Sequence, residues 1–328
     1  GGYTRNAGVA IQLLIGPWVS TSIYDITNID FQFTAVLTNT APTGPYRGAG
    51  RPEAIYIIER LMDAAARKLG LDPAELRRRN MIQPEQMPYK NAMGQSYDSG
   101  SFEKIMDQAL AASDWNGFAA RAAQSAKAGK LRGRGIATFL EWTGGNVFEE
   151  RVTVAVKANR EIEIYATTQA MGQGIATSYA QLAVDVFGVS LDNIKIVMGD
   201  SDRGSGFGSA GSRSLFTAGS AVKVAADKTV DKARDLAADA LEVAPVDLEY
   251  LAGAFQVAGT DRRIGLFELA AKQPEERIFI DSTSSVSGPT WPNGCHIAEV
   301  EIDTDTGEVA IPLYVSSNDA GRVVNPLI

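Results

Sequence analysis

The stretch IEIYATTQAMGQGIATSYAQLA, from Ile162 to Ala183, passes from a strand pattern to a helix pattern through a glycine-rich loop. Its first part is rich in alternating apolar residues, which predicts a β-strand, and the spacing of apolar residues in its last part predicts a helix. Gly172 and Gly174 flank Gln173 at the junction. Glycine lets the backbone approach a ligand closely, and a glutamine amide both donates and accepts hydrogen bonds. This loop is therefore either a ligand-binding element or a tight turn with an exposed glutamine.

Similar patterns on both sides of this stretch predict an α+β fold. Helices are expected over residues 53–69, 73–80 and 215–241 and twice within 101–129, and strands over 31–39, 132–145, 151–159 and 296–317. The character of the chain changes near Leu131, where strand patterns begin to dominate. We therefore expect two layered α/β units, 1–130 and 131–328.

The composition fits a globular protein of about two domains, with 328 residues of which 45% are hydrophobic and 21% charged. A net charge of −8 without a basic block argues against nucleic acid or an anionic membrane as the main partner. No run of about 20 apolar residues could span a bilayer. The single cysteine, Cys295, excludes an internal disulfide and is typical of a reducing, cytoplasmic compartment. The chain begins without methionine and ends on an apolar run, so we expect a piece of a longer polypeptide.

A second glycine-rich loop, GDSDRGSGFGSAGSRS (199–214), also lies between a strand pattern and a helix pattern. Gly206, Gly208 and Gly211 fit the spacing G-x-G-x-x-G, in which bare backbone N–H groups and the following helix start favour a phosphate. A glycine-rich surface turn fits this spacing as well. A nicotinamide-dependent oxidoreductase would need a further parallel strand ending in an acid about 20 residues later, and the sequence does not provide it.

A third loop, GPYRGAG (44–50), places Arg47 among glycines ahead of a helix start. This arrangement suits an anion, and it equally suits an arginine that braces the loop by bonding to carbonyl groups. The only histidine, His296, follows the only cysteine, so a zinc cluster of histidine and cysteine cannot be assembled. No protein metal ligand is therefore assigned.

Four blocks stand in a characteristic order: APTGPYRGAGRPEA (41–54), QAMGQGIATSYAQLAVDVFGV (169–189), IKIVMGDSDRGSGFGSAGSRS (194–214) and AEVEIDTDTGEVAIPLYVSSNDAGRVVNPLI (298–328). Together they resemble the molybdenum-binding large subunit of the xanthine dehydrogenase and aldehyde oxidase family. The branch they look most similar to is that of the carbon monoxide dehydrogenase-like large chains. The likeness runs over nearly all of the chain, which would cover less than half of such a subunit.

The resemblance implies an oxidoreductase that hydroxylates aldehydes or N-heteroaromatics with a molybdenum–molybdopterin cofactor, commonly in its cytosine dinucleotide form. Residues 1–130 and 131–328 would be parts of the first and second cofactor-binding domains. Electrons would leave through 2Fe–2S clusters to FAD on partner subunits or domains. The cofactor-binding residues that the family's motifs indicate are Tyr46, Arg47, Gly48, Gly172, Gln173, Gly174, Gly211 and Ser212.

The sequence also departs from the family's pattern. The carbon monoxide-oxidising members carry a cysteine-containing loop for copper, whereas Gly48 and Ala49 stand here without a thiol, so carbon monoxide oxidation is not expected. The family's catalytic glutamate lies in a Gly-Glu motif beyond residue 328, so no catalytic residue is assigned, and Glu141 and Glu149 are not substitutes for it. The chain alone is expected to be inactive. A nicotinamide-dependent enzyme and a non-catalytic scaffold module remain the alternatives.

Overall fold

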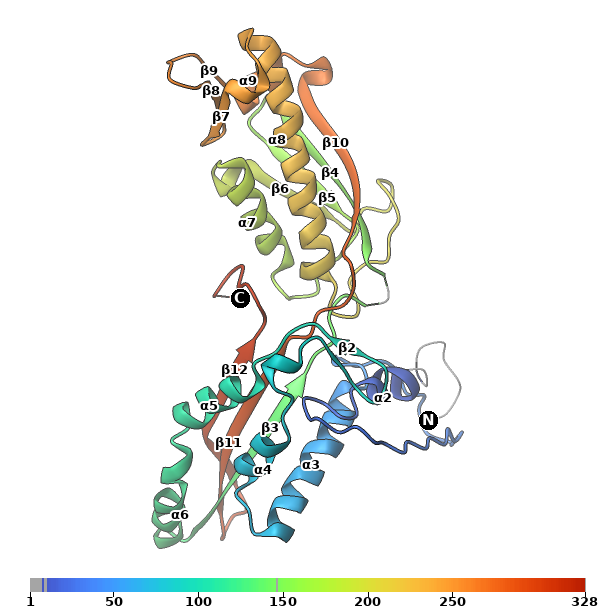
Figure 1. Cartoon of the computed structure of the whole chain (residues 1–328), viewed down its shortest axis with the longest axis vertical. Coiled ribbons are helices and arrows are strands. Elements are labelled where there is room, and N and C mark those ends of the chain that lie inside the picture. Colours follow the sequence, from blue (N-terminus) through green and yellow to red (C-terminus); the bar gives the residue numbers. More distant parts are fainter. Residues whose placement is uncertain (1–7, 9–10, 146, 328) are drawn as a thin grey trace. The chain divides into compact units, whose positions relative to one another are not determined.

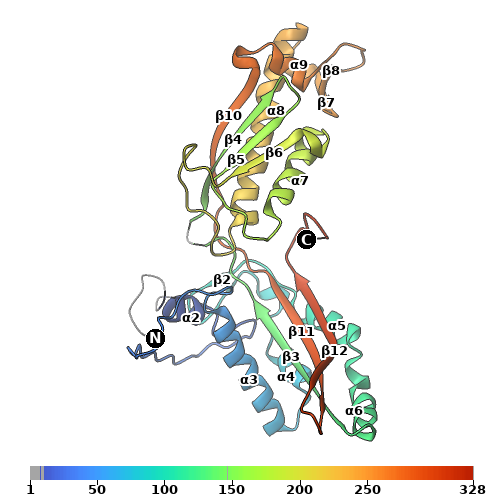
Figure 2. The ribbon, with the colours of Figure 1, turned by 180° about the vertical axis from the view of Figure 1, so that it is seen from behind.

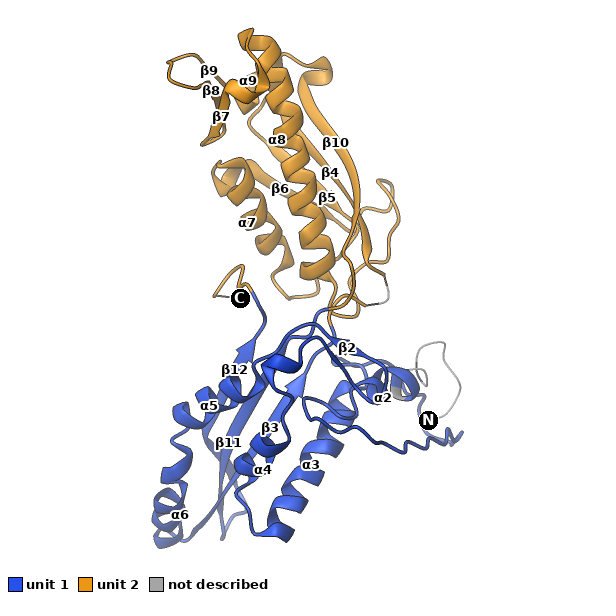
Figure 3. Ribbon diagram, viewed as in Figure 1, with its two compact units in different colours: residues 1–142, 290–321 blue, residues 143–289, 322–328 orange. Residues whose placement is uncertain are grey.

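The computed structural model describes residue 8 and residues 11–145 and 147–327, and the chain divides into two compact units. Unit 1 contains residues 1–142 and 290–321, and unit 2 contains residues 143–289 and 322–328 (Figure 3). These units differ from the contiguous division at residue 130 that the sequence suggested. The physical reason is strand pairing, because β3 (Lys130–Leu140) pairs antiparallel with β11 (Asn293–Asp303) and both therefore belong to unit 1.

Unit 1 is a three-stranded antiparallel sheet, in the order β12-β11-β3, with helices packed against it (Figure 1). Its remaining elements are η1 (Ile11–Ile15), α2 (Gly16–Trp18), α3 (Arg51–Leu69), α4 (Pro73–Asn80), η2 (Pro84–Gln86), β1 (Tyr89–Lys90), β2 (Ser96–Tyr97), α5 (Phe102–Ala112), η3 (Trp115–Gly117), α6 (Phe118–Lys127) and β12 (Val309–Asp319). The expected helices over 53–69 and 73–80 and the pair within 101–129 are confirmed as α3, α4, α5 and α6.

The strand expected over residues 31–39 does not form. The stretch 26–38 carries neither helix nor strand, and Val36 and Leu37 are 63% and 73% exposed. A β-strand is stabilised by pairing with a neighbour, and none of the described residues pairs with this stretch. The sequence also suggested extended structure over the whole of residues 1–45, and this was wrong for residues 11–18, which form η1 and α2. Residues 1–7, 9 and 10 lie outside the described residues.

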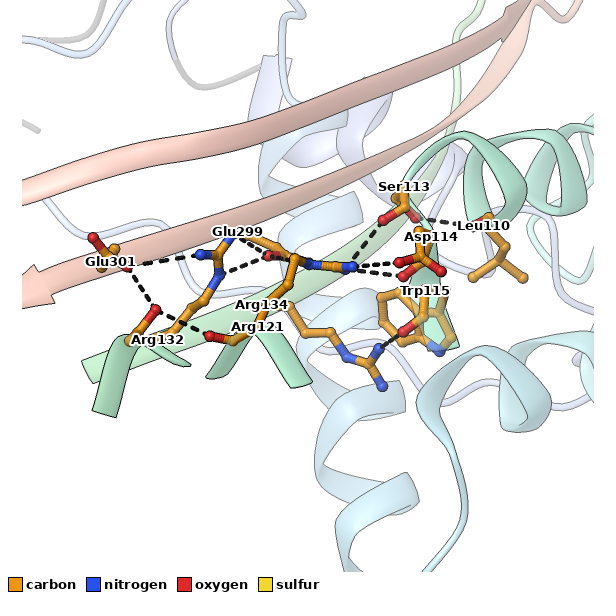
Figure 4. Close-up of polar contacts among 10 residues, drawn as sticks. Leu110, Ser113, Asp114, Trp115, Arg121, Arg132, Arg134, Glu299 and Glu301 are labelled. Atoms are coloured by element: carbon orange, nitrogen blue, oxygen red, sulfur yellow. Dashed lines mark hydrogen bonds and ion pairs between the residues drawn. The ribbon is translucent and has the colours of Figure 1, made fainter. Parts of the chain in front are cut away.

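Helix α6 is attached to the sheet of unit 1 by an ion-pair network around Glu299 on β11 (Figure 4). The carboxylate of Glu299, 1% exposed, accepts from Arg121 Nη2 at 2.6 Å and lies 2.7 Å from Arg132 Nη2. Hydrogen bonding from Arg121, followed by that from Arg132, lowers the pKa of Glu299 despite its burial. Ser125 on α6 donates to Glu301 at 2.6 Å, so helix and strand are joined at two points.

Unit 2 is a four-stranded sheet in the order β10-β4-β5-β6, in which only the β5–β6 pairing is parallel. Figure 2 shows these strands in front of α8. The elements are β4 (Glu149–Lys157), β5 (Ile162–Ala166), α7 (Ile175–Phe187), η4 (Leu191–Asn193), β6 (Ile194–Met198), η5 (Ser214–Ala218), α8 (Gly219–Leu241), η6 (Pro245–Asp247), β7 (Leu248–Leu251), β8 (Ala254–Val257), β9 (Arg263–Gly265), α9 (Leu266–Ala271), η7 (Pro274–Glu276) and β10 (Arg277–Ser285). The apolar face of the sheet packs with α7 and α8 in one buried core.

The long helix expected over 215–241 is confirmed as η5 continued by α8. The small antiparallel sheet β7-β8-β9 in the same unit was not expected from the sequence. No helix in the described part of the chain combines the length and apolar character that crossing a bilayer requires.

Candidate functional site

The glycine-rich loops of unit 2 meet at one edge of its sheet, namely the end at which the parallel strands β5 and β6 terminate. Because β5 and β6 are parallel, both end at this edge, and residues 167–174 and 199–213 leave it as loops. Strand β4 begins at the same edge, since Val152 pairs with Ala166, the last residue of β5. Helix α7 and η5 both start here after their loops. Helix starts expose N–H groups without helical partners, so this edge collects hydrogen-bond donors.

The loop 172–174 is shaped by its two glycines. Gly172 and Gly174 have φ of 89° and 69°, in the left-handed region that glycine adopts without strain. A Cβ on Gly172 would have no heavy atom within 4 Å, so its backbone faces open space. The exposed Gln173 folds back on its own loop: its Nε2 donates to Gln169 O at 3.2 Å, and its Oε1 accepts from Met171 N. One amide N–H and one acceptor lone pair of Gln173 remain for a ligand.

The second loop is held against the first by serine and tyrosine side chains. Ser209 Oγ accepts from Gln169 N at 2.9 Å and donates to Gln169 O at 2.7 Å. The buried Tyr179 of α7 donates to Ser214 O at 2.7 Å, and its hydroxyl lies 3.0 Å from that of Thr168. These contacts join the segments that follow β5 and β6 into one surface.

Gly211, one of the two predicted site residues of the second loop, lies beside Gly145. Gly211 has a φ of 62°, and a Cβ built on it would come within 2.9 Å of Gly145 Cα. Ser212 adopts a positive φ of 56° although it is not glycine. Such a conformation costs energy for a residue with a Cβ, and it persists where surrounding contacts hold it. The structure thus brings 172–174 and 211–212 to the same edge of unit 2.

Two residues that the sequence reasoning did not single out hold this edge together. Arg213 and Glu150 form an ion pair of 2.7 Å, and their side chains are 0% and 2% exposed. The only local signal was an arginine inside a run of glycine and serine and a glutamate at the start of a strand. Their partnership spans 63 residues, which periodicity and motif spacing do not reveal.

The remaining predicted residues, Tyr46, Arg47 and Gly48, belong to unit 1. Tyr46 is 87% exposed, and Arg47 is also exposed and makes no hydrogen bond or ion pair with another residue that the structure describes. The bracing arginine of this loop is instead Arg51, which is 5% exposed and whose Nη2 lies 2.8 Å from the carboxylate of Glu141. The arginine that remains available for an anion in this loop is therefore Arg47.

Other site chemistries find no support in the fold. After the glycine loop and α8, the next strand of the sheet along the chain is β10. It pairs antiparallel with β4, and in the order β10-β4-β5-β6 it lies on the opposite side of the sheet from β6. A dinucleotide fold would instead continue with parallel strands, so the nicotinamide alternative lacks its framework. Within the described ranges, no three side chains of histidine, cysteine, aspartate or glutamate gather closely enough to hold a metal ion. His296 Nδ1 lies 2.8 Å from Tyr314 Oη, a contact between two strands.

The donor set at the unit 2 edge fits a large polar ligand with phosphate groups. Two glycine loops present backbone without side chains, and two helix starts supply N–H groups, an arrangement that favours phosphate. The nearby carboxylate of Glu150 is already neutralised by Arg213 and does not repel an anion. The loops and helix starts at this edge therefore form a surface that suits a ligand carrying phosphate groups.

Comparisons with known proteins identify the family. Models of the molybdopterin cofactor-binding domain match residues 1–81 and 108–328, and the chain belongs to this family. It is 32% identical to the 6-hydroxypseudooxynicotine dehydrogenase complex subunit gamma of Paenarthrobacter nicotinovorans, over 100% of this chain and 43% of that protein. It is 34% identical to the carbon monoxide dehydrogenase large chain of Hydrogenophaga pseudoflava, over 94% of this chain and 42% of that protein.

A solved structure agrees with the sequence relatives. The quinoline 2-oxidoreductase of Pseudomonas putida 86 superimposes with a TM-score of 0.87 at 28% identity, over 99% of this chain and 44% of that chain. The resemblance to molybdenum-binding large subunits and the α+β fold are thus confirmed. The chain spans about two fifths of the length of the relatives it matches.

Proposed function

We propose that this chain is part of the large subunit of a molybdenum hydroxylase that oxidises N-heteroaromatic compounds or aldehydes. The observation that carries the proposal is that the two glycine-rich loops leave one edge of unit 2 and are joined there by Ser209 and Gln169, in a chain of the molybdopterin cofactor-binding family. The names of two relatives, a 6-hydroxypseudooxynicotine dehydrogenase and a quinoline 2-oxidoreductase, favour N-heteroaromatic substrates. Gly48 and Ala49 offer no thiol for copper, which supports leaving carbon monoxide oxidation out.

The residues of this chain would bind and orient the cofactor. Backbone N–H groups at Gly172, Gly174 and Gly211 would donate to its phosphates and ring oxygens, with Ser212 beside them. The second amide N–H of Gln173 would donate near its pterin end. Arg47 in unit 1 would pair with a negative charge. When bound, the molybdenum cofactor supplies the redox chemistry, so the protein's part is placement and electrostatics.

Three finer features belong to the same proposal. The cofactor is of the cytosine dinucleotide form, and iron–sulfur and FAD-carrying partners accept the electrons. The names of the relatives, a complex subunit gamma and a large chain, support an assembly of several subunits. A cytoplasmic location is consistent with Cys295, a buried free thiol whose pKa burial raises to about 12.

The first test measures molybdenum and cytidine nucleotide in the intact large subunit, purified with its partners from a host that makes the cofactor. Stoichiometric metal and nucleotide, with oxidation of quinoline-type or aldehyde substrates, are the expected results. A folded protein that stays empty in such a host would overturn the proposal and leave a scaffold module.

A residue-level test uses Gln173→Ala and Arg47→Ala in the intact subunit. Each should lower molybdenum content about tenfold or more, since a hydrogen bond to a charged group is worth about 1.5–3 kcal/mol. Matched controls are Gln256→Ala, another exposed glutamine bonded to its own turn, and Arg67→Ala, an exposed arginine in the last turn of α3. Equal metal content in test and control variants would remove these residues from the site.

A further inference from the structure

The ion pair between Arg213 and Glu150 is almost completely enclosed, and both side chains make several hydrogen bonds. Three nitrogens of Arg213 have acceptors: Nε donates to Val147 O at 3.1 Å, Nη2 to Glu149 O at 2.9 Å, and Nη1 to both Glu150 Oε2 at 2.7 Å and Gly208 O at 2.9 Å. One side chain therefore ties the glycine loop to the start of β4.

Glu150 extends this connection to the end of β5. Its second oxygen, Oε1, accepts from the hydroxyl of Thr167, the residue that follows β5. Thr167 is in turn packed closely against Gly206, because a Cβ built there would approach its Oγ1 to 2.2 Å. The chain of contacts from Thr167 through Glu150 to Arg213 thus links three segments that border the edge of the sheet.

This pair is poorly explained by stability alone. Removing two charges from water has a large cost, and apolar residues of similar size often stabilise a fold as well as or better than a buried ion pair. Arg213 directly follows Gly211 and Ser212, both of which hold positive φ angles. Because the guanidinium of Arg213 is hydrogen-bonded on several sides, it fixes the neighbouring backbone, whose N–H groups would donate to the ligand.

We propose that Arg213 and Glu150 are positioning residues that hold the 208–212 backbone in the conformation required to bind the cofactor. Neither side chain touches the ligand, because both are enclosed. The pair acts through the N–H groups and hydroxyl of the loop. This inference rests on the proposed function of the unit 2 edge.

Unit 1 provides a matched control for the experiment. Arg77 and Glu59 form a second enclosed pair, with an Nε–Oε2 distance of 2.8 Å and side chains 0% and 5% exposed. Glu59 also accepts from a threonine hydroxyl, that of Thr138, as Glu150 accepts from Thr167. The two pairs share chemistry and burial, but only one adjoins the glycine loops.

The test compares Arg213→Met with Glu150→Gln against Arg77→Met with Glu59→Gln, each double variant made in the intact subunit with its partners. Both double variants remove the two charges of the pair together. In the control, Asp63, which also lies 2.9 Å from Arg77, is partly exposed and keeps Arg60 at 3.7 Å. We expect the first variant to retain about tenfold less molybdenum per folded subunit after gel filtration, since the loss of one charge-assisted bond changes an equilibrium constant by about that factor. The control should retain its molybdenum while losing a similar amount of thermal stability.

If the double variant does not fold, two single variants that remove less from the core test the same inference. Thr167→Val removes one bond to Glu150 and Thr138→Val the equivalent bond to Glu59, at nearly constant volume. Thr167→Val should lower molybdenum retention about threefold relative to Thr138→Val. Thr138 also contacts Tyr24 Oη at 3.0 Å, so its variant should lose at least as much thermal stability. A purely structural role would lower the melting temperature without changing the metal content of the folded subunit.

The outcomes separate the two proposals. A loaded wild-type subunit whose Arg213 variant holds as much molybdenum as the Arg77 control would overturn the positioning role alone. A wild-type subunit without molybdenum would overturn the proposed function, and this inference with it. Selective loss of molybdenum in the unit 2 variants supports both.

Discussion

Replacing Gly211 by alanine tests the backbone geometry of the candidate site most directly. The φ of 62° lies in the left-handed region, which costs a residue with a Cβ about 1–2 kcal/mol. The new Cβ would also lie 2.9 Å from Gly145 Cα, a backbone atom that cannot rotate away. Overpacking of this kind costs about 1–3 kcal/mol, so the total loss expected for Gly211→Ala is about 2–5 kcal/mol.

Gly259→Ala isolates the conformational part of this cost. Gly259 lies in the same unit, in the turn between β8 and β9, with a φ of 73° and no heavy atom within 4 Å of its Cβ position. The free energy of unfolding of Gly259→Ala should therefore fall only by the cost of the left-handed conformation, about 1–2 kcal/mol. The difference between the two variants is the contribution of the contact with Gly145.

The assay must report unit 2. The four tryptophans, Trp18, Trp115, Trp142 and Trp291, all belong to unit 1, so their fluorescence does not follow unit 2 directly. Hydrogen exchange of the β4 and β5 amides in increasing urea gives the opening free energy of the correct sheet. Molybdenum content of the intact subunit is measured in parallel. Equal opening free energies for the two alanine variants, with full metal content in Gly211→Ala, would refute the reasoning.

Two further predictions concern unit 1, where tryptophan fluorescence reports unfolding. Arg77→Met leaves the buried carboxylate of Glu59 without its cation and should cost about 3–5 kcal/mol in urea unfolding; a loss below about 1 kcal/mol would contradict this. Glu299 has a lowered pKa in the folded state, so the unfolded state binds more protons at acidic pH. Its stabilising contribution is present above the unfolded glutamate pKa of about 4.3 and is lost as pH falls through the folded pKa. Glu299→Gln should therefore weaken the fall in unfolding free energy between pH 6 and pH 3, and parallel curves for the variant and the wild type would exclude the effect.

Local signals in the sequence were sufficient for the longer helices, although η1, α2 and α9 were not expected. Helix α3 ends at Leu69, and Gly70, with a φ of 66°, caps it by donating its N–H to carbonyl groups of the last turn. Asp72 caps the start of α4, because its side chain accepts from Ala74 N at 2.8 Å. Such capping interactions join residues only a few positions apart, so the spacing of residue types specifies them. The helix boundaries were accordingly expected within about two residues.

The sequence did not allow us to predict which strands pair with each other. The alternation within Phe31–Asn39 is as regular as that of true strands, yet this stretch has no partner among the described residues. Conversely, β11 pairs with β3 across more than 150 residues, which places residues 290–321 in unit 1. A pattern of alternating residues shows that a strand has two different faces, but it carries no information about which strand lies beside it.

The candidate site follows the same division between local and distant causes. The residue types were enough to single out the loops around Gln173 and Gly211, because glycine is favoured where φ is positive or where a ligand approaches the backbone closely. The parallel pairing of β5 with β6 sends both loops to one edge, and the enclosed Arg213–Glu150 pair holds that edge to the start of β4. The donors offered there are mostly backbone N–H groups, which every residue except proline possesses. If the proposed function is correct, much of the specificity for the cofactor lies in the path of the backbone, which the glycines and the buried pair fix, and Gln173 and Arg47 add side-chain contacts to it.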